Sequence, residues 1–187
     1  MAPVTSGGSR GRWPSCLLLA VVSVCPLSSQ TGNEYEVKAA FLYKFASFVE
    51  WPAEASNPPL GICVLGQDPF GPSLDRITRD KRVSGRPFMV RRLRPGEGVG
   101  ECHILFIAAS ERPRLKQILD SRQGEPVLTV SDVPGFCESG GDINLALADN
   151  RVRLEINPAA MQRAGLLVSS RLLSLARLVR EYEVAAR

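Results

Sequence analysis

The chain has 187 residues, 44% of them hydrophobic, with 23 basic and 19 acidic side chains and a formal net charge of +4. This weak positive charge, without a DNA- or RNA-binding motif, argues against a nucleic-acid-binding protein. A single histidine argues against a multi-histidine metal site and a histidine-dependent catalytic triad.

The first 29 residues are typical of a secretion signal. Arg10 and Arg12 precede a ten-residue apolar stretch at 16–25, and the small residues Ser28 and Ser29 follow it. The stretch is too short to span a membrane, and we expect cleavage near Ser29. A lipoprotein signal is the alternative, with lipid added at Cys25, although Val24 stands where a small residue is preferred. Cleavage lowers the formal charge to +2 and leaves residues 30–187, enough for one domain with a sizeable core.

Residues 35–51 are predicted to form an amphipathic helix, with Asn33 as its N-cap and an end near Trp51 before Pro52. Lys38 interrupts the apolar side and would extend its ammonium group toward solvent. Two interpretations remain open: a helix that packs on the core, or one that binds a partner or a membrane. The apolar side is expected to consist of Val37, Phe41, Leu42, Phe45, Phe48 and Val49.

The rest of the chain alternates strands and helices. Strands are predicted at 60–65, 88–93, 103–108 and 127–130, and a hairpin joins 143–148 to 151–156 through Asp149 and Asn150. Helices are predicted at 73–79, at 110–121 with Ser110 as cap, after Asn157 with Pro158 in the first turn, and after Ser169 or Ser170. This order indicates a single α/β domain with a mixed sheet of five to six strands and helices on both faces.

The cysteines that follow the signal are Cys63, Cys102 and Cys137. Export exposes them to an oxidising compartment. Cys63 and Cys102 lie in two predicted strands that neighbour each other in one sheet, so we expect a disulfide between them. Cys137 is then a free thiol or an intermolecular partner.

Candidate catalytic residues are few. His103 follows Cys102 directly, so in a strand their side chains point to opposite faces, which is poor geometry for a catalytic pair. Residues 67–72 (QDPFGP) predict a turn rather than a phosphate loop, because the glycine spacing does not fit. Asp132 follows a strand end, where α/β proteins often bind ligands, but a turn role is favoured. The hairpin face with Arg151, Arg153 and Glu155, and Met161 and Arg163 beyond it, is an interaction surface or a solvated face.

The string at 37–52, VKAAFLYKFASFVEWP, resembles the opening signature of the YfiR family of small periplasmic proteins. Further blocks follow in the family's order: ICVLGQDPFG, ECHILFIAASE, VLTVSD, the glycine pair before INLAL, RVRLEIN and SSRLLSLARLV. The resemblance covers nearly all of residues 34–180 and identifies 30–187 as a YfiR-like domain.

The resemblance implies a periplasmic, non-enzymatic regulator without cofactor or metal. Such proteins repress an inner-membrane diguanylate cyclase of the YfiN type by acting on its periplasmic sensing domain. An outer-membrane lipoprotein sequesters the repressor, after which cyclic di-GMP and biofilm formation rise. The resemblance also implies a homodimer that is redox-sensitive through its disulfides. The alternatives are a small-molecule sensor module of another membrane signalling system and, more remotely, an exported hydrolase.

The resemblance also assigns residues. Cys63 and Cys102 match the family's paired cysteines, and Cys137 matches half of a second pair whose partner is absent from DINLAL. The family's partner or ligand surface maps to Glu138, Ile143, Glu155, Met161 and Arg163.

Overall fold

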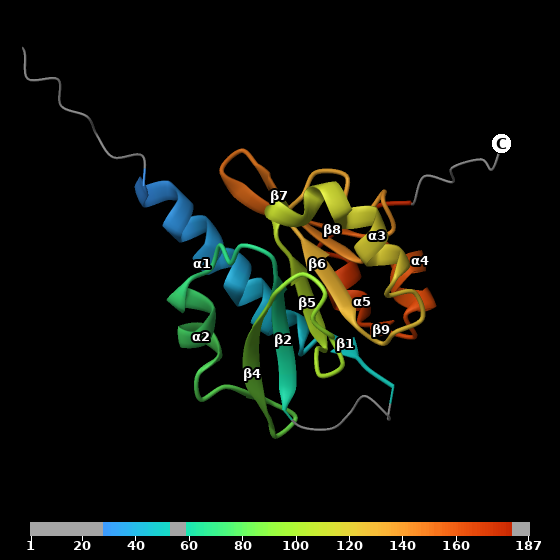
Figure 1. Cartoon of the computed structure of the whole chain (residues 1–187), viewed down its shortest axis with the longest axis horizontal. Coiled ribbons are helices and arrows are strands. Elements are labelled where there is room, and N and C mark those ends of the chain that lie inside the picture. The colour runs from blue at the N-terminus through green and yellow to red at the C-terminus, as the bar shows by residue number, and fades with distance from the viewer. Residues whose placement is uncertain (1–27, 53–58, 181–187) are drawn as a thin grey trace, which may run out of the picture.

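An eight-stranded mixed sheet forms the centre of the protein in the computed structural model, which describes residues 28–52 and 59–180 (Figure 1). The strand order is β10-β8-β7-β6-β5-β2-β4-β3, and β1 and β9 form a separate two-stranded sheet. The elements are α1 (Ser28–Phe45), β1 (Val49–Glu50), β2 (Leu60–Leu65), α2 (Pro72–Thr78), β3 (Arg82–Val83), β4 (Arg86–Leu93), β5 (Ile104–Ile107), the 3-10 helix η2 (Ala109–Arg114), α3 (Leu115–Asp120), β6 (Leu128–Ser131), β7 (Ile143–Ala148), β8 (Arg151–Ile156), α4 (Pro158–Arg163), β9 (Leu167–Val168), α5 (Ser170–Leu173) and β10 (Arg177–Leu178).

The centre of the sheet is parallel and its ends are mixed. Strands β4, β2, β5, β6 and β7 run in one direction, whereas β8 is antiparallel to β7 and β3 is antiparallel to β4. The mixed α/β class is therefore confirmed. The expected five to six strands are the six longer ones; β3 and β10 extend the sheet, and two residues are too few to show a periodic pattern.

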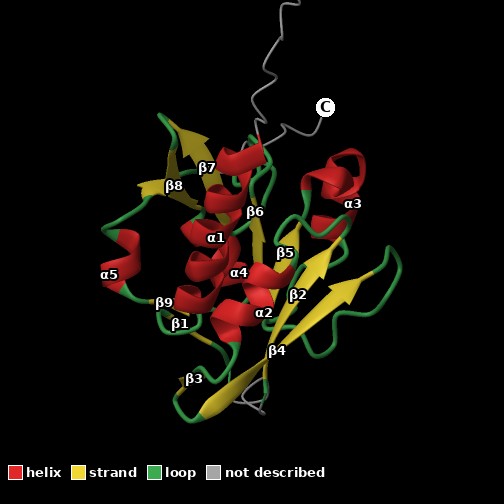
Figure 2. Cartoon of the chain, turned by 90° about the vertical axis from the view of Figure 1, so that its left-hand side faces the viewer, coloured by secondary structure: helices red, strands yellow, loops and turns green. Residues whose placement is uncertain are grey.

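Helices cover both faces of the sheet, as expected. Alternate residues of β2 and β5 belong to two separate apolar clusters: Ile62 and Phe106 pack with α1 and α2, whereas Leu65 and Leu105 pack with α3. Figure 2 shows α1 and α2 together on one side of the sheet. Since both faces are buried, the central strands are continuously apolar rather than alternating.

Helix α1 differs from the prediction at both ends. It begins at Ser28, so Asn33 lies inside it rather than capping it, and it ends at Phe45. Val49 and Glu50 form β1, which pairs with β9. The helix packs on the core through Ala39, Leu42 and Phe45, which supports the core-packing interpretation. Val37 is exposed, contrary to prediction, and the expected secretion signal lies almost entirely outside the described residues.

A disulfide joins Cys63 of β2 to Cys102, two residues before β5, which confirms the expected pair. The bond closes a loop with a sequence separation of 39 residues, for which chain entropy gives about 4 kcal/mol. Gly61 makes this approach possible, because a Cβ at that position would lie 1.9 Å from the carbonyl oxygen of Glu101. The Gly61 amide also donates to Nδ1 of His103 (3.1 Å).

Two helix predictions required correction. The predicted 110–121 helix is divided between Arg114 and Leu115 into η2, which contains Pro113, and α3. The Ser110 hydroxyl accepts a hydrogen bond from the Gln67 amide (2.9 Å) instead of capping a helix. The tail after Ser169 forms only the four-residue α5 before it turns into β10.

The hairpin and the cap of α4 were predicted correctly. Asp149 and Asn150 have φ values of 51° and 56°, the left-handed pair that a type I′ turn requires. The Asn157 side chain accepts a hydrogen bond from the amide of Ala160 at the start of α4, and Pro158 occupies the first turn.

Candidate partner-binding surface

Two carboxylates meet one arginine at the β10 end of the sheet. Glu155 lies on β8, Glu138 lies in the turn after β6, and Arg177 lies on β10 beside Glu155. The Arg177 Nε donates to Oε1 of Glu155 (3.1 Å), and its Nη2 lies 3.9 Å from Oε1 of Glu138. Glu138 and Arg177 are 39 positions apart in the sequence and share one charge cluster, because β10 joins the sheet beside β8.

Neighbouring polar groups leave this cluster with unused acceptors. Asn144 of β7 donates its Nδ2 to Oε2 of Glu155 (2.9 Å). Among the described residues, neither Oδ1 of Asn144 nor Oε2 of Glu138 has a hydrogen-bond partner, although both atoms are buried. Such acceptors are costly unless a donor reaches them.

Cys137 lies beneath the cluster and is unreactive. Its thiol is fully buried, and its sulfur lies 3.4 Å from the backbone oxygen of Glu155. Burial, followed by the charge of Glu155, raises the pKa of the thiol to about 12. A thiol of this kind stays protonated at neutral pH and is shielded from exchange. Within the described residues Cys137 forms no disulfide, and its burial favours the free thiol over an intermolecular partner.

The residues that the family resemblance assigned to a surface do not all lie on one. Ile143 and Met161 are 0% and 1% exposed, so they belong to the core beneath α4 and this part of the expectation is wrong. Glu138 and Glu155 are half-buried and reach the cluster, and Arg163 is exposed on α4. Arg177 was missed, because the leucine-rich tail that contains it was predicted to be helical.

Arg163 borders a second polar site, a cavity of about 130 Å3 between α3, β6 and α4. Asp142 lies in its wall and is almost wholly buried. Its Oδ2 accepts from the amide (2.8 Å) and the hydroxyl (2.6 Å) of Thr129. The loss of hydration on burial outweighs these two hydrogen bonds and raises the pKa of Asp142 to about 6.

Exposed leucines flank the charge cluster at the sheet edge. Leu175 is 67% exposed just before β10, and Leu178 is 57% exposed within it. Strand β10 is the last strand on this side of the sheet among the described residues, so its outer backbone groups face away from the sheet. Apolar side chains beside an open strand edge are typical of a protein-binding surface. We call Glu138, Glu155, Leu175, Arg177 and Leu178 the β10 surface.

The remaining candidates have structural roles. His103 is buried between Gly61 and Arg86, whose Nη2 lies 2.8 Å from its Nε2, and Cys102 is consumed by the disulfide. The 67–72 segment is a turn, in which Oδ1 of Asp68 accepts from the amide of Phe70 (2.7 Å). In the described part of the chain, no three His, Cys, Asp or Glu side chains are grouped as a metal ion would require.

Asp132 is more than a turn residue. The Lys38 ammonium reaches its Oδ2 (2.7 Å) and also binds Glu34, and the Tyr35 hydroxyl donates to the same Oδ2 (2.9 Å). Lys38 is only 2% exposed, so it does not extend to solvent as predicted. Burial, and then the charge of Asp132, raises the pKa of Tyr35 well above its ordinary value. This cluster fixes α1 to the end of β6.

The chain belongs to the YfiR/HmsC-like family, which matches residues 35–177. This match confirms the family resemblance given by the sequence motifs, and members of the family are regulators of a periplasmic type rather than enzymes. In the part of the chain that the structure describes, no helix has the length and apolar character needed to cross a membrane.

Proposed function

We propose that the protein is a periplasmic repressor that binds the sensing domain of an inner-membrane diguanylate cyclase of the YfiN type through the β10 surface. The observation that supports this most is the pair of half-buried carboxylates on Arg177 at an open sheet edge beside exposed leucines. A central ionic group surrounded by apolar side chains is the usual composition of a protein interface.

Binding would lower cyclase output by stabilising the resting state of the sensing domain, and the shift is limited by the difference in affinity for its two states. An outer-membrane lipoprotein that competes for the β10 surface would release the cyclase and raise cyclic di-GMP. We include export directed by residues 1–29 and a homodimer in this proposal. The dimer is tested by sedimentation of the purified protein over a range of concentrations.

The deciding experiment measures intracellular cyclic di-GMP in a strain that lacks the gene. The deletion should raise cyclic di-GMP, and expression of the wild-type protein should return it to the low level of the parent strain. Arg177→Glu places a third negative charge beside Glu138 and Glu155 and should leave cyclic di-GMP high. Arg112→Glu makes the same charge change at an exposed arginine on η2, away from the β10 surface. This control should lower cyclic di-GMP as the wild-type protein does.

Each result bears on a different part of the proposal. Full repression by Arg177→Glu, at equal protein levels, would remove the β10 surface from the mechanism. No rise on deletion would contradict repression itself and would favour a sensor module of another signalling system.

A further inference from the structure

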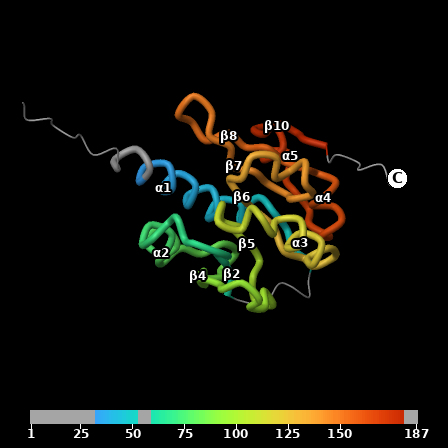
Figure 3. Tube along the Cα trace, turned by 45° about the horizontal axis from the view of Figure 1, so that its top comes forward, coloured from blue at the N-terminus to red at the C-terminus, as the bar shows by residue number. Residues whose placement is uncertain are grey.

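The basic residues of this chain are concentrated on the sheet edge opposite β10. Residues 72–94, which form α2, β3 and β4, contain eight of the 23 basic side chains and two of the 19 acidic ones. The rest of the chain is net acidic. Figure 3 shows α2 and β4 on the far side of the molecule from β8 and β10. A positive edge on an otherwise acidic protein attracts anions.

Half of these basic residues already have partners. Arg92 binds Asp75 and Asp68, Arg76 binds Glu36, and Arg91 binds Glu101. Arg86 contacts His103. The hydrogen bond from Arg92 lowers the pKa of Asp75, whose charge is therefore already compensated.

Three of the remaining four cations lie at one cavity, and the fourth, Arg94, does not line it. Arg79, Lys81 and Arg82 line a hollow of about 310 Å3 between the end of α2 and β4, together with Phe88 and Val90. Within residues 28–52 and 59–180, Arg79 and Lys81 have no ion-pair partner, and Arg82 donates only to the backbone oxygen of Gly85 (3.1 Å). This volume is at the lower end of the range for small-molecule sites.

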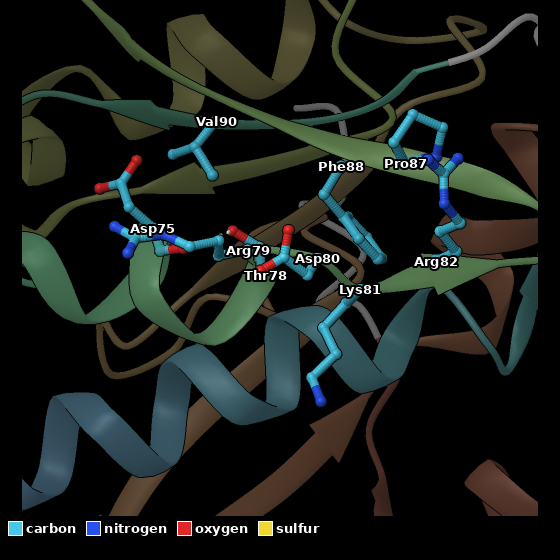
Figure 4. A pocket seen from close by; sticks show the side chains of 9 residues that line it. All are labelled: Asp75, Thr78, Arg79, Asp80, Lys81, Arg82, Pro87, Phe88 and Val90. Carbon is cyan, nitrogen blue, oxygen red and sulfur yellow. Dashed lines mark hydrogen bonds between the residues drawn. The ribbon is translucent and has the colours of Figure 1, made fainter.

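The local backbone explains how these cations come to lie together. Arg79 ends α2, Asp80 adopts a left-handed φ of 57°, and the chain turns straight into β3. Ser84 and Gly85 then form a tight turn that returns the chain as β4 and carries Phe88 to the cavity. Figure 4 shows the ring of Phe88 between Arg79 and Arg82, with the charged end of Arg79 toward Asp75 and Lys81 extended toward α1. The three cationic side chains are exposed and would have to turn inward to share one ligand.

We propose that this cavity binds the phosphate group of an anionic ligand, held by Arg79, Lys81 and Arg82, with Phe88 as the apolar wall. Guanidinium groups bind phosphate oxygens in a two-pronged manner, and an ammonium group adds a point charge. Asp75, which binds Arg92, and Asp80 also line the cavity, so its three cations exceed its acidic side chains by one. An aromatic wall favours a ligand that carries a ring or an apolar group next to its phosphate.

The same chemistry is offered by a free organic phosphate and by a phospholipid headgroup, and two probes distinguish them. Adenosine monophosphate (AMP) is titrated by calorimetry at low salt, with adenosine as the uncharged comparison. Vesicles that contain phosphatidylglycerol are tested by co-sedimentation, with phosphatidylcholine vesicles as control. Saturable binding of AMP, at least tenfold tighter than that of adenosine, indicates a free phosphate ligand. Retention by the anionic vesicles alone indicates a lipid headgroup.

Substitutions of the cavity cations test whether these side chains bind the probe. Arg79→Glu/Lys81→Glu should lower affinity for the bound probe at least tenfold, and the milder Lys81→Gln/Arg82→Gln should lower it severalfold. Arg112→Glu/Lys116→Glu makes the same net charge change on exposed residues of η2 and α3 and should bind as the wild type does. The proposal is overturned if the wild type binds neither probe, or if the cavity variants bind as tightly as the control. These residues lie at the opposite sheet edge from Arg177. The result of the binding test therefore does not decide the result of the repression experiment.

Discussion

Two clusters in this protein have the same arrangement of charges and different surroundings. In each, one cation is shared by two carboxylates: Lys38 by Glu34 and Asp132, and Arg177 by Glu138 and Glu155. The Lys38 side chain is 2% exposed, whereas that of Arg177 is 66% exposed. The main difference is burial, between a cluster that holds α1 in place and one that lies at the surface.

The physical reason lies in the solvent. At Lys38 the charges have lost their water, so each depends on its partner, and removing one leaves an uncompensated charge in the interior. At Arg177 water replaces any lost contact, and the ion pairs add little to folding. Substitutions at Lys38, Asp132 and Arg177 test this contrast, and Asp142 adds a buried carboxylate held by the amide and hydroxyl of Thr129. The expected effects on the free energy of unfolding decrease in the order given.

Lys38→Met should give the largest effect. It leaves Asp132 buried without its cation, which costs about 3–5 kcal/mol in comparable sites. Urea unfolding of the purified protein measures this loss of stability. Lys44→Met, at an exposed position of the same helix, serves as control and should unfold like the wild type. A Lys38→Met protein within about 1 kcal/mol of wild type would mean that the buried cluster is not needed for folding.

Asp142 should make stability depend on pH. Its pKa is raised from 3.8 to about 6 in the folded state by burial, so the folded protein holds this proton more tightly than the unfolded chain. The stabilisation is complete below about pH 4 and is lost as the pH rises through 6, on the order of 2–3 kcal/mol. Asp142→Asn should flatten that part of the stability profile. An equal slope in the variant would assign the pH dependence to other groups.

A double-mutant cycle should show that Lys38 and Asp132 act as a unit. Asp132→Asn removes the carboxylate and leaves an amide for the Tyr35 hydroxyl. Combining it with Lys38→Met should cost less than the sum of the single changes, with a coupling of about 1–3 kcal/mol. Simple additivity of the two changes would contradict the direct pairing seen in the structure.

Arg177→Gln should have the smallest effect on folding. The side chain is exposed, so the urea midpoint should match that of the wild type, although partner binding should weaken. Stability is compared by unfolding and binding by cyclic di-GMP output in the complemented deletion strain. A lowered midpoint would indicate that the β10 surface serves to hold the C-terminal strand rather than to bind a partner.

Local patterns allowed much of the fold to be predicted. The continuous apolar run of β2, the turn at Asp149 and Asn150, and the cap at Asn157 depend on neighbouring residues, and all were predicted from the sequence. The disulfide was predicted because one cysteine lies in a strand segment and the other lies at the start of the neighbouring one. Helix ends were less certain, since the extra turn of α1 before Asn33 shows no distinct periodicity.

The site was harder to predict, because it depends on contacts between distant segments. Lys38 was expected to reach solvent because nothing in the helix pattern indicates Asp132, 94 residues away. Arg177 was hidden in a leucine-rich stretch that favours a helix, and only pairing with β8 makes it a strand. Ile143 and Met161 were assigned by family position, which does not report whether a side chain points inward.

The pairing of β1 with β9 limits when the protein can acquire its structure. Val49 and Glu50 meet Val168 and Leu167, and the Ser169 amide donates to the oxygen of Phe48 (2.9 Å). The segment after α1 must therefore wait for more than a hundred further residues to be synthesised before its strand partner exists. Contacts that span most of the chain form slowly and late. Deletion of Leu167 and Val168 would leave the segment after α1 without its strand partner.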